Sequence, residues 1–170
     1  TPYVGEAVKL FVYAIDTGAA IAGLATTKKI YIRAGTTLYD ITPIRATFTT
    51  STTPSTDNCF TTNTTTGTEG QVLVTLAGHG ATTGDFVTFS GAVAVGGITA
   101  VQLNLEFEVT VLTGSTFTIQ TAGTATSVAT GGGTSITAAF QINIGADSSI
   151  AGYGWGAGTW SRGTWGSGAT

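Results

Sequence analysis

Residues 71–92, QVLVTLAGHGATTGDFVTFSGA, carry the pattern that decides the fold. The apolar run QVLVTL at 71–76 predicts one strand, and turn signals follow it at HG (79–80) and GD (84–85). The run FVTFS at 86–90 predicts a second strand, with Phe86, Thr88 and Ser90 on one face and Val87 and Phe89 on the other. Short strands separated by glycine turns are typical of a small all-β domain.

The same pattern continues toward the C-terminus. Further strands are predicted in EFEVTVL at 106–112, in STFTIQTA at 115–122 and in SITAAFQINI at 135–144. These strands recur at intervals of roughly 8–12 residues, as in sandwiches and barrels. The sequence therefore predicts a small β-barrel or β-sandwich domain over residues 71–145.

The first 46 residues are expected to form strands and a hairpin of a structural domain. Residues 4–15, VGEAVKLFVYAI, are apolar on both faces of a strand, and such a strand is covered on both sides by protein or by a partner. A small-residue connection, DTGAAIAGLATT, is expected at 16–27. Residues 28–44 predict a hairpin that turns at Ala34-Gly35.

Residues 47–70, TFTTSTTPSTDNCFTTNTTTGTEG, are rich in threonine and serine and have little charge or apolar pattern. Such a stretch indicates a linker or an extended segment, either an exposed loop or an edge strand. The remaining residues, 146–170, are a Gly/Trp-rich tail. Threonine is also abundant outside these stretches, and its β-branched side chain favours extended backbone throughout the chain.

Charge is unusually scarce in this chain. Charged residues make up 9% and hydrophobic residues 42%, with a net charge of −3 and a mean hydropathy of +0.31. Few charges indicate a surface that faces copies of the same chain, although an extracellular domain solvated by its hydroxyl groups has the same composition. The dispersed basic residues exclude a nucleic-acid groove, and no apolar run approaches the roughly 18 residues of a membrane helix.

Possible catalytic and metal-binding residues are few. His79, Asp85 and Ser90 are the residue types of a hydrolase triad, but all three lie within one hairpin, where side chains seldom converge. Glu106 and Glu108 share a strand face, which is more typical of solvated carboxylates than of a glycosidase pair or a calcium site. The single cysteine, Cys59, excludes an internal disulfide and a cysteine metal cage. We therefore predict no enzyme activity, no metal and no cofactor.

Residues 71–120 resemble the first catalytic cysteine half-domain of ubiquitin-activating enzymes. That family carries an HG–x–x–x–GD–x–V–x–F pattern, then an asparagine before a strand, then a T/S-F-x-I strand. The resemblance implies a small antiparallel β-barrel without the enzyme's activity, because the thioester cysteine and the adenylation domain are not in this pattern. The matching positions are His79, Gly80, Gly84, Asp85, Val87, Phe89, Asn104, Phe117 and Ile119. We expect His79, Gly80, Gly84, Asp85 and Asn104 to define the turns of the barrel.

The tail GYGWGAGTWSRGTWGSGAT, residues 152–170, holds all three tryptophans, Trp155, Trp160 and Trp165. A spacing of five lines up side chains on neither a strand nor a helix. Large amphipathic aromatics are favoured where one surface docks on another. We therefore expect these tryptophans and Tyr153 to contact another subunit or further chain.

From residue 28 to the end, the chain also resembles a family of tail proteins of tailed bacteriophages. The segments YDITPIRAT and WGAGTWSRGTWG carry this resemblance. It implies a virion structural protein whose partners are copies of itself, in a ring or tube, and other tail proteins. The alternative is an extracellular adhesion module that binds a host surface glycan or receptor through the tryptophan-rich end. The chain begins at TPYVGE without methionine and members of this family usually continue past the tryptophans, so we expect a segment of a longer protein.

Overall fold

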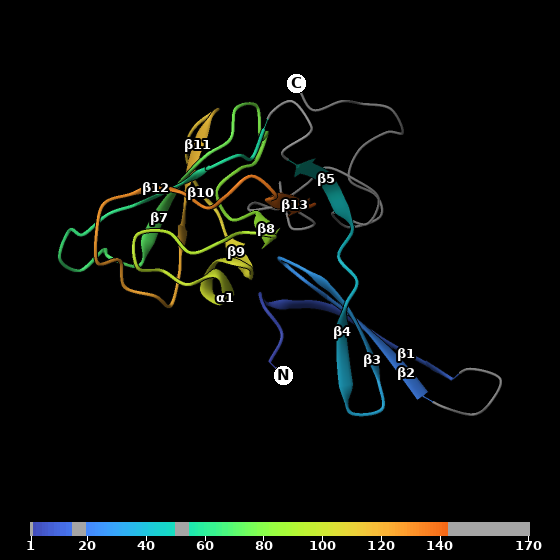
Figure 1. Ribbon diagram of the computed structural model, residues 1–170. Helices are drawn as coiled ribbons and strands as arrows, with labels where there is room; N and C mark the ends of the chain where they lie inside the picture. The colour runs from blue at the N-terminus through green and yellow to red at the C-terminus, as the bar shows by residue number, and fades with distance from the viewer. Residues whose placement is uncertain (1, 15–19, 50–54, 143–170) are drawn as a thin grey trace, which may run out of the picture.

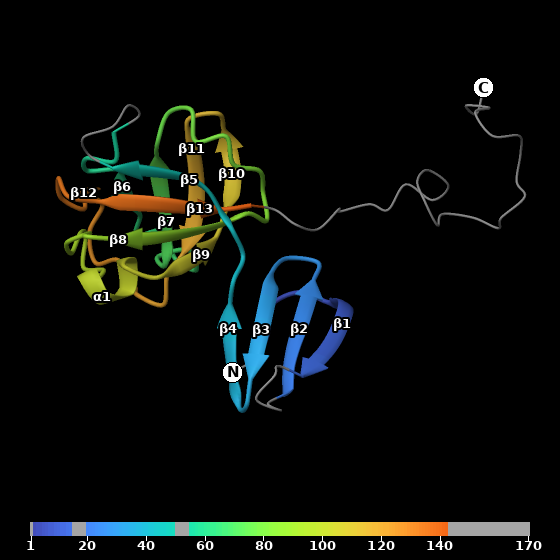
Figure 2. The same cartoon turned by 90° about the vertical axis from the view of Figure 1, so that its right-hand side faces the viewer.

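The computed structural model describes residues 2–14, 20–49 and 55–142 and shows a nearly all-β protein with antiparallel sheets (Figure 1). This confirms the predicted fold class. The described residues form three sheets. Two of them enclose a shared apolar core, and we call these two sheets and their loops the core unit. The third, the N-terminal sheet, extends from the core unit as a separate layer (Figure 2). No helix among the described residues is long and apolar enough to cross a membrane.

The N-terminal sheet is a meander in the order β1-β2-β3-β4. Its strands are β1 (Ala7–Ala14), β2 (Ala20–Thr26), β3 (Ile30–Ala34) and β4 (Thr37–Asp40). The last two strands form the hairpin expected over 28–44, and Gly35 at its turn has a positive φ of 61°.

The expected small-residue connection at 16–27 was wrong, because β2 occupies most of it. This strand pairs with β1 on one side and with β3 on the other. Gly23 leaves room for an aromatic ring on this strand: a Cβ atom there would lie 2.8 Å from the ring of Phe11 on the neighbouring strand. The glycine therefore marks a close approach between β2 and a side chain of β1. Hydrogen bonding to β1 and β3 outweighs the weak strand propensity of the small residues in β2.

The first sheet of the core unit has the order β5-β13-β8-β9. Its strands are β5 (Ile44–Thr49), β13 (Thr137–Gln141), β8 (Phe86–Ser90) and β9 (Glu106–Glu108). Strand β5 follows the N-terminal hairpin directly in sequence, yet it pairs with β13, some 90 residues later. The core unit therefore begins at Ile44, before the domain boundary expected at residue 46.

The second sheet of the core unit has the order β10-β11-β7-β6-β12. Its strands are β10 (Thr110–Thr113), β11 (Thr116–Gln120), β7 (Gln71–Thr75), β6 (Phe60–Thr62) and β12 (Thr130–Gly131). The expected strand at 106–112 divides into β9 and β10, in different sheets. The division falls at buried Val109, which donates to the Asp85 carbonyl and accepts from the Gly84 N–H.

One short helix, α1 (Ala100–Leu103), lies in the connection between β8 and β9 of the first sheet, where no helix was expected. Thr99 caps its N-terminus, and Gln102 returns a side-chain hydrogen bond to the Thr99 N–H at 3.0 Å, so the two form a capping box. Leu103 at its end is fully buried and anchors the helix to the core.

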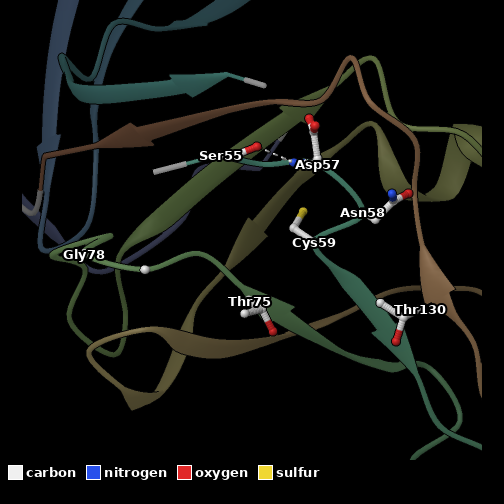
Figure 3. A pocket seen from close by; sticks show the side chains of 8 residues that line it. Ser55, Asp57, Asn58, Cys59, Thr75, Gly78 and Thr130 are labelled. Carbon is white, nitrogen blue, oxygen red and sulfur yellow. Dashed lines mark hydrogen bonds between the residues drawn. The ribbon is translucent and has the colours of Figure 1, made fainter. Parts of the chain in front are cut away.

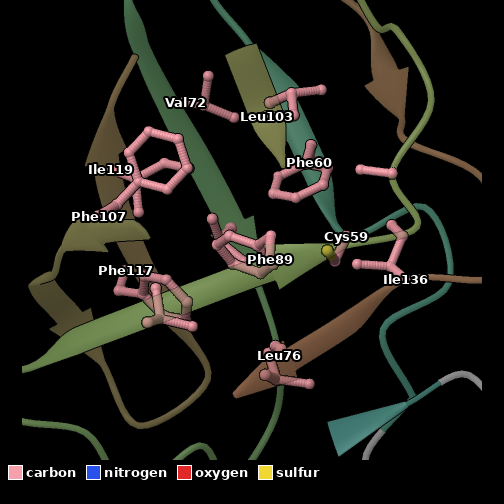
Figure 4. Packing of buried hydrophobic residues seen from close by; sticks show 14 of the residues in the cluster. Cys59, Phe60, Val72, Leu76, Phe89, Leu103, Phe107, Phe117, Ile119 and Ile136 are labelled. Carbon is pink, nitrogen blue, oxygen red and sulfur yellow. The ribbon is translucent and has the colours of Figure 1, made fainter. Parts of the chain in front are cut away.

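Aromatic side chains from both sheets fill the core (Figure 4). Phe60 and Phe89 meet edge to face at 4.9 Å between ring centroids, and Phe117 and Phe140 do so at 5.8 Å. Aromatic pairs favour this geometry because the positive ring edge meets the negative ring face. The core therefore joins β6 and β8 in one place and β11 and β13 in another.

The sequence left open whether the Thr/Ser-rich stretch 47–70 is a linker or an extended segment, and its described part contributes strands to the core unit. Phe60 is fully buried, and the β6 that it begins pairs with both β7 and β12. Thr56 is also buried and donates its hydroxyl hydrogen bond to the Ile136 carbonyl. Such a polar stretch can be buried because its threonine hydroxyl groups donate hydrogen bonds to nearby backbone carbonyl groups.

Candidate functional site

The most unusual surface of the described chain is β1. All eight of its residues are exposed, including five large apolar side chains that we call the β1 surface. These are Val8, Leu10, Phe11, Val12 and Tyr13. Leu10 and Val12 are 62% and 67% exposed, well above what a core strand shows. Large exposed apolar side chains that gather on one element indicate an interaction site, whereas scattered single ones do not.

The exposed side chains lie on both faces of the N-terminal sheet. On one face Leu10 lies opposite Leu24 and Val12 opposite Ala22, and with Leu38 they line an open hollow of about 610 Å³. On the other face Phe11 follows the row through Gly23 to Ile32 and Tyr39. The sequence predicted a strand covered on both sides, and no described residue of this chain covers β1.

Two lysines join the N-terminal sheet to the core unit. Lys29 precedes β3 and is only 1% exposed, and its ammonium lies 2.7 Å from Asp40 of β4 and also contacts Glu106 of β9. The same ammonium lies 4.6 Å from the centre of the Phe86 ring. The neighbouring Lys28 pairs with Glu108 at the surface.

These ion pairs change the interpretation of the two glutamates. Glu106 and Glu108 were expected to be solvated carboxylates; they remain 34% and 50% exposed, but each also pairs with one lysine of the β2–β3 turn. Sequence reasoning did not identify Lys29. Its available signal was a lysine pair at the start of an apolar strand, which does not reveal a carboxylate 77 residues away.

Burial and hydrogen bonding act in opposite directions on Lys29 and Asp40. Burial acts to lower the pKa of Lys29, but hydrogen bonds to Asp40 and Glu106 outweigh it and raise that pKa. Burial acts to raise the pKa of Asp40, but hydrogen bonds from Lys29 and Thr42 lower it. Both groups are therefore held in their charged forms, with Asp40 Oδ1 also accepting from Thr42 at 2.6 and 2.9 Å.

His79 uses both ring nitrogens on the backbone. Its Nδ1 accepts from the Ala81 N–H at 3.0 Å, so Nε2 carries the proton and donates to the Thr113 carbonyl at 3.0 Å. The ring is 1% exposed and packs edge to face on Phe117. His79 thus ties its own turn to the end of β10, and neither nitrogen is free for Asp85.

The other predicted turn residues lie nearby in the same unit. Gly80 and Gly84 have positive φ values of 58° and 97°. Asp85 is buried and accepts from the Thr82 N–H at 2.9 Å, which closes the turn before β8. Asn104 exchanges two hydrogen bonds of 2.8 Å with the backbone of Ala92. These residues lie in turns and connections of the core unit, and their role in defining the turns of a barrel stays a prediction.

A second hollow, of about 660 Å³, is lined by the segment before β6, by the end of β7 with the residues after it, and by the start of β12 (Figure 3). Its lining combines apolar surface with the hydroxyl groups of Ser55, Thr75 and Thr130, the Asn58 amide, the Asp57 carboxylate and the Cys59 thiol. Burial raises the pKa of the Cys59 thiol to about 12, so this thiol stays protonated at neutral pH. A protonated thiol is a poor nucleophile. Ser55, Asn58 and Thr130 in this lining already hydrogen-bond within the protein, so nothing in the described part of it points to a catalytic role for the hollow.

The predicted contact residues Tyr153, Trp155, Trp160 and Trp165 lie outside the described residues. Within the described ranges, no three histidine, cysteine or acidic side chains group as metal ligands. The absence of a metal or cofactor in the whole chain stays a prediction.

Comparison with known proteins gives little beyond this geometry. No protein-family model and no curated protein sequence matches the chain. Among solved structures, phage phi92 endosialidase is similar over 78% of this chain, at 20% sequence identity and a TM-score of 0.41. The match spans 19% of the endosialidase chain. Similarity at this level does not establish a shared fold and says nothing about activity.

Proposed function

We propose that this chain is a non-enzymatic virion structural protein of a tailed bacteriophage. In this proposal it is a tail component that forms a homo-oligomeric ring or tube through β-edge and tryptophan-rich contacts. The resemblance of residues 28–170 to phage tail proteins supports the phage assignment. Its partners are then copies of itself and other tail proteins, and it is located in the virion.

The observation that carries the proposal is the open N-terminal sheet. Stable domains bury a sheet against a second layer, because an apolar face exposed to water has an unfavourable free energy. The β1 surface has no second layer among the described residues, and its side chains point to both faces. A protein that functions inside an assembly obtains the missing cover from its neighbours.

The charge content supports the same conclusion. With only 9% charged residues, the chain has little electrostatic repulsion to keep copies apart. Closed symmetric assembly also covers free sheet edges that would otherwise aggregate.

The test is the assembly state of the purified 170-residue chain, measured by native mass spectrometry and negative-stain imaging over a range of concentrations. A defined ring or filament supports the proposal. A chain that stays monomeric and binds host-surface glycans contradicts it and favours the adhesion alternative. Glycan binding is measured on the same preparation, so that one experiment separates the two.

A further inference from the structure

We infer that two copies of this chain pair edge to edge through β1, antiparallel about a two-fold axis, to form one continuous eight-stranded sheet. The inference rests on the proposed function only in taking the protein to be a homo-oligomer. It names the contacting strand, the partner and the symmetry of one contact.

The first step is that the outer edge of β1 is free. Strand β1 is last in its sheet and pairs only with β2, so the other side of its backbone has no strand partner among the described residues (Figure 2). Monomeric proteins protect such edges with short strands, proline, charges or bulges. Strand β1 is eight residues long, has one register irregularity near its start at Ala7–Lys9, and carries one charge, Lys9.

The second step is that the side chains on both faces need cover. A partner stacked on one face of the sheet would cover Leu10 and Val12 but leave Phe11 and Tyr13 in water. A strand added at the edge places its side chains beside those of β1 on both faces at once. Edge addition is therefore the arrangement that fits the distribution of exposed residues.

The third step is that β1 itself is the best matching strand in the described chain. The partner strand should be long and apolar on both faces. The other described edge strands are shorter, and most are polar: β4 and β10 have four residues, β9 has three and β12 has two. Strand β5 has six residues, but three of them are polar: Arg45, Thr47 and Thr49. A second copy of β1 offers an eight-residue ladder.

Charge is compatible with this self-pairing. Strand β1 has a lysine and no carboxylate, so the two lysines must avoid each other. In an antiparallel pair centred on Leu10, Lys9 lies opposite Phe11 of the second copy. In a pair centred on Phe11, Lys9 lies opposite Tyr13 of the second copy. Both registers place the ammonium beside an aromatic ring, where cation–π attraction is favourable.

The area is sufficient for a specific but modest contact. Side chains of this size at half to two-thirds exposure each present on the order of 100 Å². The β1 surface then presents about 500 Å² per copy, and two copies bury up to about 1,000 Å², near the lower limit of specific interfaces. We therefore expect pairing that depends on protein concentration. A two-fold contact also closes on itself, so a ring needs a second contact elsewhere.

Disulfide trapping tests the geometry directly. In a Cys59→Ser background, Leu10→Cys and Phe11→Cys are oxidised separately in the full chain. We expect one of them to cross-link with itself in high yield, with Ala14→Cys giving little. If instead Phe11→Cys cross-links only when mixed with Thr37→Cys on β4, the contact is head to tail and the inference is wrong.

A charge substitution supplies the second measurement. Val12→Lys should weaken self-association at least tenfold by analytical ultracentrifugation, while the matched control Val101→Lys, on α1 at 78% exposure, should leave it unchanged. Circular dichroism checks that both variants fold. Rings that form normally with Val12→Lys and without β1 cross-links overturn this inference but leave the proposed function standing. Cross-linked dimers that never assemble further support this inference but contradict the proposed ring or tube. A chain that is monomeric in every measurement contradicts both.

Discussion

The N-terminal sheet and the core unit use the same strand-forming residues and reach opposite outcomes. In the core unit, two sheets close over Phe60, Phe89, Phe117 and Phe140, each nearly or fully buried. In the N-terminal sheet, four strands of similar apolar content form a single layer, and Phe11 stays half exposed. The difference teaches that apolar content makes strands, but a second layer decides whether a sheet is a core or an interface.

The sharpest way to break this comparison is to truncate one phenylalanine in each region. Phe60→Ala should destabilise the core unit by about 3–5 kcal/mol, because it leaves a cavity between two sheets. Phe11→Ala should change the free energy of unfolding by less than about 1 kcal/mol, since its ring is already half in water. Urea unfolding of both variants at low protein concentration measures the contrast. Equal losses would mean that Phe11 is a core residue.

Added methyl groups test how tightly each region is packed. Gly91→Ala should cost about 3 kcal/mol, because the residue has a φ of 77° and its Cβ atom would lie 2.0 Å from the Ser135 carbonyl oxygen. Gly35→Ala, in the β3–β4 turn, should cost only about 1 kcal/mol, because its φ is positive but nothing lies within 4 Å. Thermal melts of the two variants measure both stability losses. A larger loss in Gly35→Ala than in Gly91→Ala would contradict the prediction.

The link between the two regions is tested at Lys29. Lys29→Met leaves Asp40 and Glu106 without their buried cation and should destabilise the protein by about 2 kcal/mol. That is less than for a fully buried pair, because both carboxylates are about one-third exposed. The N-terminal sheet should also become more accessible, measured by hydrogen exchange of β3. Lys28→Met is the matched control, since its ion pair lies at the surface and should matter little.

The same ion pair predicts a pH dependence. The pKa of Asp40 is lowered from 3.8, so its stabilisation is present above that value and is lost as the pH falls through the lower, folded-state pKa. The pKa of Lys29 is raised from 10.5, so its stabilisation is present below that value and is lost as the pH rises through the higher, folded-state pKa. The stability difference between wild type and Lys29→Met should therefore be flat near neutral pH and shrink at both extremes. A difference that changes between pH 6 and 8 would point to another group.

The smallest expected effect on stability comes from the tail. Trp160→Ala should leave the melting of the core unit unchanged while weakening assembly, because the tryptophans are expected to contact another subunit or further chain. Melting temperature and native mass spectrometry on one sample check both parts. A lower melting temperature with normal assembly would make Trp160 a core residue of its own domain.

Local pattern was a good guide where neighbouring residues decide the structure. The β3–β4 hairpin, β7, β8 and β11 lie within the predicted runs, because alternation and glycine turns act over a few residues. Pattern failed at β2 and β6, where small residues and threonines carry weak signals. There the deciding interactions are hydrogen-bonded ladders on both sides of each strand. Strand β2 pairs with β1 and β3, and β6 pairs with β7 and with β12, which lies about 70 residues later in the sequence.

The candidate site divides in the same way. The sequence by itself predicted a strand apolar on both faces within residues 4–15, which the structure places at Ala7–Ala14, and a turn around His79 and Asp85. Only the tertiary structure decided that β1 lies at an open sheet edge, and that Lys29 is buried between Asp40 and Glu106. The reason is physical: alternation and turn propensity are properties of adjacent residues, whereas burial and ion pairing depend on which distant strands meet.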